Sequence, residues 1–194
     1  MTDRARHRYL IDLDGWIISG TDPVRGEIRS PSLADADGLA QLMLDAYAGT
    51  IDYHGESITD ARAEIEEYLS SEPILECSRV VEIGGELAAA TLVSLWDGAP
   101  QISYVMTRSS RKGQGLARVV LVSALDCLAR TSNRQVNAFI TEGNTASERL
   151  FASLGAVLLD LHRHRLPGQP VEVLELPHHA RSLTLTGRAR PEGE

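Results

Sequence analysis

The first residues that could do chemistry form a short glycine-containing turn, Lys112-Gly-Gln-Gly-Leu-Ala. The turn follows a run of strand-forming residues from Gln101 to Thr107 and precedes a run with helical spacing. Glycines let the backbone approach a ligand closely, and the first free N–H groups of the helix would point at that ligand. Together with the positive end of the helix dipole, this arrangement predicts an anion site suited to a pyrophosphate.

Basic side chains gather around the same turn, although the chain as a whole is acidic. Its 194 residues include 19 Lys and Arg against 27 Asp and Glu, which gives a net charge of -8. The local basic residues are Arg108, Arg111, Lys112 and Arg118. A strand-to-helix turn with a solvated basic edge would show the same composition, and this alternative stays open. A P-loop is not supported because no GxxxxGK[ST] string occurs, and a dinucleotide fingerprint lacks its third glycine.

The elements that must position this turn follow the pattern of a mixed domain. Strands are expected at residues 27–29, 80–83, 87–96, 101–107, 136–140, 157–161 and 171–176. Four helices are expected, with N-caps at Ser32, at Thr59, at the glycine turn, and at Asn144 or Thr145 with Glu148 completing a capping box. Residues 9–18 predict two short strands around Asp14-Gly15. The order predicts an α/β (α+β) fold with a mixed central sheet of about six to seven strands, about four helices and an extra N-terminal β-hairpin.

Composition places the chain among ordinary globular proteins, with 43% hydrophobic and 24% charged residues. A net-acidic chain is a poor general binder of nucleic acid. Cys77 and Cys127 lack CxxC or CxxH spacing, which excludes a zinc knuckle and argues against a disulfide framework. The sequence has no apolar run long enough for a membrane span and no apolar leader at its start. We therefore expect a soluble, reduced, cytoplasmic domain that binds neither nucleic acid nor membrane.

Two segments resemble the signatures of the GCN5-related N-acetyltransferases, the GNAT superfamily. The glycine turn is similar to the family's (Q/R)xxGx(G/A) acetyl-CoA signature, with Lys112 in the first place. The segment from Asn144 to Ala156 is similar to the second signature, Asn-x-x-Ala/Ser…Leu-Tyr-x-x-x-Gly-Phe, and follows the first at the family's separation. The resemblance covers residues 27–177. It implies a GNAT-like acetyltransferase domain at 27–180, after a hairpin extension at 1–26 and before a flexible tail at 181–194.

The resemblance implies that acetyl-CoA is the co-substrate. Val105, Met106 and Thr107 would line its pantetheine arm with backbone groups, and a backbone N–H near Met106 would stabilise the oxyanion. Asn144 would contact the same arm where the sheet splays, and it would also cap a helix. The other cofactor-binding residues would be Lys112, Gly113, Gln114, Gly115, Leu116, Ala117 and Phe151.

The chain departs from the family pattern at two positions that handle protons. The family's usual acid is a tyrosine, but Phe151 stands here and has no proton to give. Some relatives carry a glutamate where this chain has Gln101. Tyr104 is then a candidate acid, beside Ser147 or water, and Glu142 is a candidate base, with a relay of water as the default. These departures keep a second hypothesis open, a catalytically idle acyl-CoA-binding or sensing module.

The acceptor side in this family is formed by the loop between the first two helices and by the late strands. Here that loop carries Tyr47, Asp52, Tyr53 and Glu56, and carboxylates between aromatic rings suit a cationic amine. A solvated acidic loop is the alternative. His162 and His164 share a strand face, but without a third ligand in view we expect no metal. The leading prediction is acetyl transfer to a primary amine of a small molecule or peptide, by direct attack in a ternary complex. A homodimer is compatible with it.

Overall fold

The computed structural model describes residues 5–17 and 26–159. The strands of these segments are β1 (Arg6–Asp12), β2 (Glu27–Arg29), β3 (Arg79–Ile83), β4 (Glu86–Trp96), β5 (Ala99–Thr107), β6 (Gln135–Thr141) and β7 (Val157–Leu159). The helices are α1 (Ala36–Tyr47), α2 (Ile58–Ser70), α3 (Leu116–Leu128) and α4 (Thr145–Ala152). The strands form one sheet in the order β2-β3-β4-β5-β6-β1-β7. The predicted mixed sheet with four helices is confirmed. The expected strand at 171–176, the tail at 181–194 and the His162–His164 pair lie outside the described residues.

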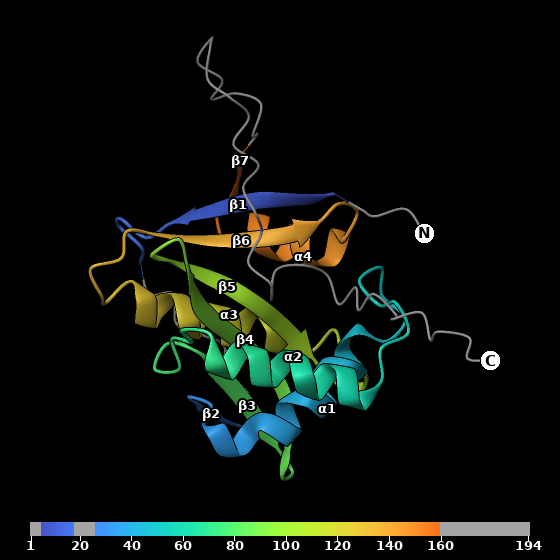
Figure 1. The fold of residues 1–194 in the computed structure, drawn as a ribbon. Coiled ribbons are helices and arrows are strands. Elements are labelled where there is room, and N and C mark those ends of the chain that lie inside the picture. The colour runs from blue at the N-terminus through green and yellow to red at the C-terminus, as the bar shows by residue number, and fades with distance from the viewer. Residues whose placement is uncertain (1–4, 18–25, 160–194) are drawn as a thin grey trace, which may run out of the picture.

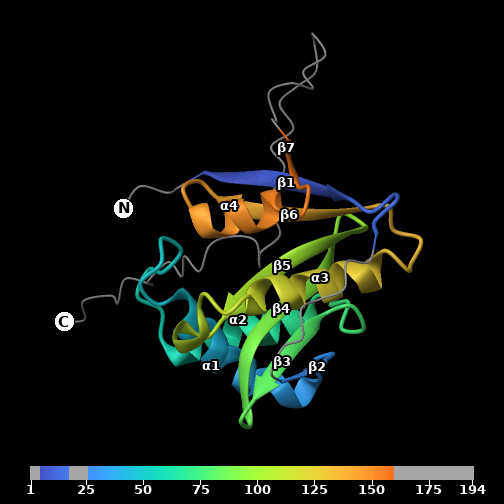
Figure 2. The ribbon, with the colours of Figure 1, turned by 180° about the vertical axis from the view of Figure 1, so that it is seen from behind.

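Helices cover both faces of the sheet. Figures 1 and 2 show α1 and α2 on one face and α3 and α4 on the other. Apolar side chains of α1 and α2, such as Leu39 and Ile65, pack on β3, β4 and β5 in one core cluster. In a second cluster, α3 and α4 pack Leu121, Leu125 and Phe151 against β1 and β6. The sheet is therefore held between two apolar layers.

Strands β5 and β6 diverge after a short contact. They pair in parallel only at Gln101 with Asn137 and at Ile102 with Ala138. The pairing of β5 with β4 shifts register just beyond this point, because Tyr104 pairs with Leu92 while Ile102 pairs with Val93. Ser103 is the extra residue of this β-bulge, and a bulge bends the strand that carries it. The bend leaves the ends of β5 and β6 apart, and a cavity opens there.

Strand β1 lies inside the sheet, antiparallel to both β6 and β7. The expected hairpin around Asp14-Gly15 has only this first strand, because residues 13–17 form none and Ile18 lies outside the described residues. The prediction of a second strand is thus wrong at residues 16 and 17. The Trp16 indole N–H instead donates to Asp126 Oδ1 of α3 at 2.7 Å. The chain after the turn therefore packs on α3.

The two cysteines form a disulfide, which corrects the expectation of a reduced chain. Cys77, just before β3, bonds to Cys127 in the last turn of α3, with their Cα atoms 5.2 Å apart. A separation of 50 residues carries no spacing signal. The pairing depends on how α3 packs beside β3. A hydrogen bond also joins β3 to α3, because Arg79 Nε donates to Ser123 Oγ at 3.1 Å.

One helix start has another cap than expected, and a second has the expected cap without the expected capping box. Ser57, and not Thr59, caps α2, since its Oγ accepts from Asp60 N and its N–H donates to Asp60 Oδ2. Asn144 caps α4 by accepting from Ser147 N at 3.1 Å. Glu148 accepts from the N–H of Gly143 and so completes no box with Thr145.

Within residues 5–17 and 26–159, no helix combines the length and apolar character that crossing a bilayer requires. The cytoplasmic location stays a prediction.

Candidate active site

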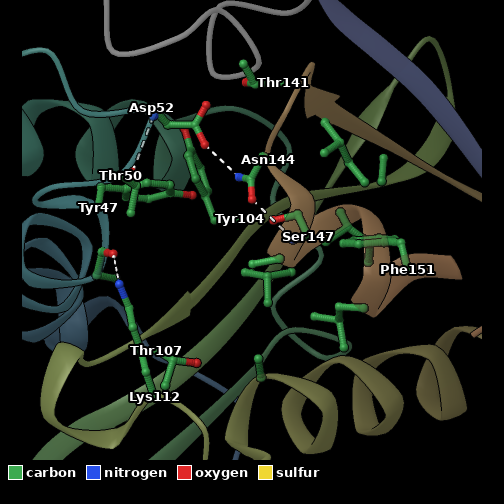
Figure 3. Close-up of a pocket in the computed structure, with 18 of the residues that line it drawn as sticks. Tyr47, Thr50, Asp52, Tyr104, Thr107, Lys112, Thr141, Asn144, Ser147 and Phe151 are labelled. Atoms are coloured by element: carbon green, nitrogen blue, oxygen red, sulfur yellow. Dashed lines mark hydrogen bonds between the residues drawn. The ribbon is translucent and has the colours of Figure 1, made fainter. Parts of the chain in front are cut away.

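A cavity of about 490 Å³ opens between the diverging ends of β5 and β6. Its walls also come from the loop after α1, from α2, from the glycine turn and from α4 (Figure 3). Most of the predicted site residues line it: Tyr47, Asp52, Tyr104, Val105, Thr107, Lys112, Gly113, Gly115, Leu116, Ala117, Asn144 and Phe151. Five predicted residues do not: Met106, Gln114, Tyr53, Glu56 and Glu142.

The glycine turn presents backbone donors at one end of the cavity. Gly113 and Gly115 have φ values of +80° and +77°, the left-handed region that favours glycine. A Cβ added at either would meet no atom within 4 Å, so open space lies beside the turn. Gly115 caps α3 without a side-chain hydrogen bond. The N–H groups of the first turn of α3 are therefore available to an anion.

The end of α1 holds this turn in place. Lys112 Nζ donates to the carbonyl oxygen of Ala46 at 2.9 Å, where a cation complements the negative end of the helix dipole. Asp45 accepts from both the N–H and the Oγ of Ser109, at 2.5 and 2.8 Å. The Lys112 ammonium is thus hydrogen-bonded to α1, and the backbone N–H groups of the turn are the donors that face a ligand.

The backbone of β5 alternates between its neighbour β4 and the cavity. The N–H of Arg108 donates to the carbonyl oxygen of Ala88 on β4. Residues two apart on a strand direct their N–H groups to the same side, so the N–H of Met106 also faces β4. The N–H groups of Val105 and Thr107 face the cavity instead. The side chain of Met106, 1% exposed, packs in the core with α1 and α2. A Met106 oxyanion donor is therefore not supported by the strand geometry, and Val105 and Thr107 have the required direction.

A half-satisfied carboxylate lies at the other end of the cavity. Asp52 is 9% exposed, and its Oδ2 accepts from Asn144 Nδ2 at 2.8 Å, as Figure 3 shows. Its Oδ1 is buried and has no hydrogen-bond partner within the described residues. Because Asn144 also caps α4, one side chain joins the loop after α1 to the start of α4. A buried carboxylate oxygen without a partner favours a ligand that donates hydrogen bonds or carries positive charge.

Sequence reasoning missed Glu64 of α2, which also lines the cavity. The Tyr104 hydroxyl donates to Glu64 Oε1. Burial raises the pKa of Glu64, while the hydrogen bond from Tyr104 acts to lower it. Burial and the neighbouring Glu64 carboxylate raise the pKa of Tyr104 well above its ordinary value. A signal existed in the sequence, because Glu64 shares the helical stripe of the buried residues Ala61, Ile65 and Tyr68.

Two acceptor-loop residues, Tyr53 and Glu56, support the loop and do not line the cavity. Glu56, 8% exposed, accepts from the N–H of His54 at 2.9 Å, and the Tyr53 hydroxyl donates to the carbonyl oxygen of Glu56. Tyr47 does line the cavity, and burial raises the pKa of its phenol. Glu142 is exposed, and its backbone N–H bonds to the carbonyl oxygen of Ala5. Its side chain does not line the cavity, and its role as a base stays a prediction.

The sequence matches the family model described as "Acetyltransferase (GNAT) domain" over residues 25–157. The chain belongs to the GNAT acetyltransferase family. The predicted resemblance is confirmed, and with it the prediction that the protein is an acetyltransferase. The match begins at residue 25, so β1 precedes it, and the domain boundaries at 26/27 and 180/181 stay predictions. A comparison with curated proteins finds no significant match.

Several solved structures share the GNAT fold of this chain. A GCN5-related N-acetyltransferase from Sphaerobacter thermophilus has 17% identity and a TM-score of 0.59, covering 80% of this chain and 49% of that one. YncA from Salmonella typhimurium, solved with its cofactor acetyl-CoA, has 22% identity and a TM-score of 0.54, covering 68% and 79%. A ribosomal-protein-alanine N-acetyltransferase from Brucella melitensis has 22% identity and a TM-score of 0.52, covering 66% and 83%. This chain spans about half the length of the Sphaerobacter protein. At these identities the likeness shows the fold.

The GNAT cavity of this chain fits an acyl-CoA. The open space beside Gly113 and Gly115 leaves room for a pyrophosphate against the start of α3. Farther in, the buried Thr107 Oγ1 has no hydrogen-bond partner within the described residues, and it lines the same cavity. A polar ligand with amide groups would satisfy this oxygen and the cavity-facing N–H groups of β5. Among the described residues, no group of three or more His, Cys, Asp or Glu side chains could hold a metal ion.

Proposed function

We propose that this protein transfers an acetyl group from acetyl-CoA to a primary amine, by direct attack in a ternary complex. The observation that carries the proposal is one cavity with two chemically different ends. One end offers the free backbone donors of α3 for a pyrophosphate, and the other offers the unpaired Oδ1 of Asp52 for an ammonium. The name of the Brucella relative gives a ribosomal-protein alanine as its acceptor, which supports an amine acceptor here.

Backbone groups do most of the work on the acyl side. Bound acetyl-CoA supplies the acetyl group as a thioester. Residues 113–117 hold its pyrophosphate, and the N–H groups of Val105 and Thr107 meet the pantetheine amides and the developing oxyanion. One such positioned donor contributes about 10²–10³ in rate. Phe151, buried in the cavity wall, packs against the arm near the thioester.

Two carboxylates act on the amine, Asp52 of the loop between α1 and α2 and Glu64 of α2. Asp52, held by Asn144, binds the ammonium. Glu64 accepts the proton that the ammonium must lose before its nitrogen can attack, and Tyr104 holds the Glu64 carboxylate in place. The C–N bond then forms at the acetyl carbon, the C–S bond breaks, and the nitrogen loses its second proton. Phe151 has no proton to give, so water carries this second proton to the leaving thiolate, which a thiol pKa of about 8.5 makes a tolerable leaving group.

An idle acyl-CoA-binding module is the second candidate, and one observation favours it. Phe151 lines the cavity at the position of the family's usual acid, and Gln101 is buried without lining the cavity. The protein would then hold an acyl-CoA without turning it over.

One assay separates the two candidates. The protein is given acetyl-CoA and a panel of amines that spans amino acids, polyamines, aminoglycosides and short peptides. Thiol release is followed, and each product is checked by mass. Transfer predicts amine-dependent thiol release and a product heavier by one acetyl group. If acetyl-CoA binds in a titration and no amine in the panel accelerates thiol release, the transferase proposal fails and the binding module stands.

A further inference from the structure

Strand β1 brings a guanidinium to the amine end of the cavity. Arg6 pairs with Thr141, the last residue of β6, and its half-buried side chain lines the cavity. The family match begins only at residue 25, so this side chain comes from outside the matched residues. Within the described residues, Arg6 forms no hydrogen bond and no ion pair through its side chain.

Three acidic or phenolic groups lie within electrostatic reach of Arg6. Its positive charge acts to lower the pKa of Tyr47, Glu64 and Tyr104, in each case against the larger effect of burial. The carboxylates of this end are already engaged by other donors. Glu64 accepts from Tyr104, and Asp52 accepts from Asn144. Among the described residues, the cavity therefore presents a cation without a partner, Arg6, and a carboxylate oxygen without a partner, Asp52 Oδ1. Both charges act on Tyr47, so they lie at the same end.

A ligand that pairs with only one of Arg6 and Asp52 leaves the other charge partly buried and unpaired, which costs binding free energy. An amine without an acidic group would pair with Asp52 and leave the half-buried guanidinium unpaired. Arginine presents a planar fork of donors that matches a carboxylate with two parallel hydrogen bonds. A small molecule that carries both an ammonium and a carboxylate would pair with both residues at once.

We propose that the acceptor is a compact zwitterion, an α-amino acid or a close analogue, whose ammonium binds Asp52 and whose carboxylate binds Arg6. This inference rests on the proposed acetyl transfer and names its substrate class. The two ion pairs, with Asp52 and with Arg6, would also orient the acceptor and hold its nitrogen beside Glu64.

The test compares matched acceptors that differ only in the acidic group. Each α-amino acid of the panel is assayed beside its carboxamide and its decarboxylated amine. We expect kcat/KM for the preferred amino acid to exceed that for its carboxamide by at least about tenfold. Arg6→Gln should abolish this preference by lowering kcat/KM for the amino acid alone. The KM for acetyl-CoA should not change.

Two further variants and a binding measurement complete the design. Arg134→Gln removes one positive charge from an exposed pair with Asp14 and should leave the preference intact. Arg6→Lys keeps the charge and should retain part of the preference, which also covers the case in which Arg6→Gln folds poorly. Calorimetry of the amino acid with the CoA-bound protein should show binding that Arg6→Gln weakens.

The outcomes distinguish failure of the zwitterion assignment from failure of the proposed acetyl transfer. Equal kcat/KM for amino acids and their carboxamides, or a preference that survives Arg6→Gln, overturns the zwitterion assignment while acetyl transfer stands. A preference for peptides whose first residue lacks an acidic side chain also overturns it. Thiol release that no amine of the panel accelerates would overturn the proposed function itself.

Discussion

Asp52 and Glu64 are two carboxylates of one cavity with different partners. Asp52 is held by the Asn144 amide, and its other oxygen has no partner in the described part of the chain. Glu64 is held by the phenol of Tyr104, and burial raises its pKa. The first environment suits the binding of a cation, and the second suits the uptake of a proton. At the scale of single residues, the two roles can therefore be separated by mutation.

We expect Asp52→Asn to raise the KM for the amine several-fold and to leave the KM for acetyl-CoA unchanged. The substitution keeps the size of the side chain and removes the charge that pairs with the ammonium. A partly screened pair of this kind contributes about 0.2–1 kcal/mol, and more where water is excluded. Steady-state kinetics in both substrates measures it. Glu56→Gln is the matched control, because Glu56 is equally buried in the same loop but does not line the cavity. Equal effects of the two variants would count against the role of Asp52.

We expect Glu64→Gln to remove the acidic limb from the pH profile of kcat/KM. A base works only when deprotonated, so activity falls as pH drops through its pKa. Because burial raises that pKa, the limb should lie above the ordinary range of a glutamate. Tyr104→Phe removes a hydrogen bond that lowers the pKa of Glu64, so the same limb should move to higher pH. A wild-type limb that persists in Glu64→Gln would assign the proton to another group.

At the scale of elements, the start of α3 provides the backbone donors at one end of the cavity. The positive φ of Gly115 bends the chain so that the first N–H groups of the helix face the cavity. The side chains of Lys112 and Ser109 bond this turn to the end of α1. Because β5 leads into the turn and its bulge separates β5 from β6, the same strand shapes both ends of the cavity.

We expect Gly115→Asp to weaken acetyl-CoA binding by at least about tenfold, or 1.4 kcal/mol. The new carboxylate would stand in the open space beside the turn and repel a pyrophosphate. Titration calorimetry with acetyl-CoA gives the affinity. Gly84→Asp controls for backbone strain, because Gly84 has a similar φ of +66° and open space but lies in the β3–β4 turn. An unchanged affinity in a folded Gly115→Asp protein would remove the phosphate role of the turn.

At the scale of the whole molecule, distant segments are joined across the sheet. Strand β1 completes the sheet between β6 and β7, and it adds Arg6 to the cavity. The Cys77–Cys127 disulfide ties the segment before β3 to the end of α3, the helix whose other end lines the cavity. The disulfide thus constrains the C-terminal end of α3, and neither cysteine lines the cavity.

We expect loss of the disulfide to lower the free energy of unfolding by about 2–4 kcal/mol, because the bond closes a long loop in the unfolded chain. Denaturant unfolding of the oxidised protein and of the Cys77→Ala, Cys127→Ala double variant measures the difference. Acetyl-CoA affinity of the folded variant should stay unchanged, since neither cysteine lines the cavity. Two reactive thiols in the purified, unfolded and unreduced protein would show that the bond does not form.

The sequence by itself determined the local features of this protein. Hydrophobic periodicity marked the helices and most strands, and the glycines of residues 113–115 marked a turn that needs positive φ, because both signals depend on neighbours along the chain. Only the tertiary structure decided the rest. The bulge at Ser103 determines which β5 donors face the cavity, and helix packing brings Glu64 to Tyr104 and Cys77 to Cys127. Sheet pairing places Arg6 at the site. Such contacts join segments far apart in sequence, so no local spacing records them.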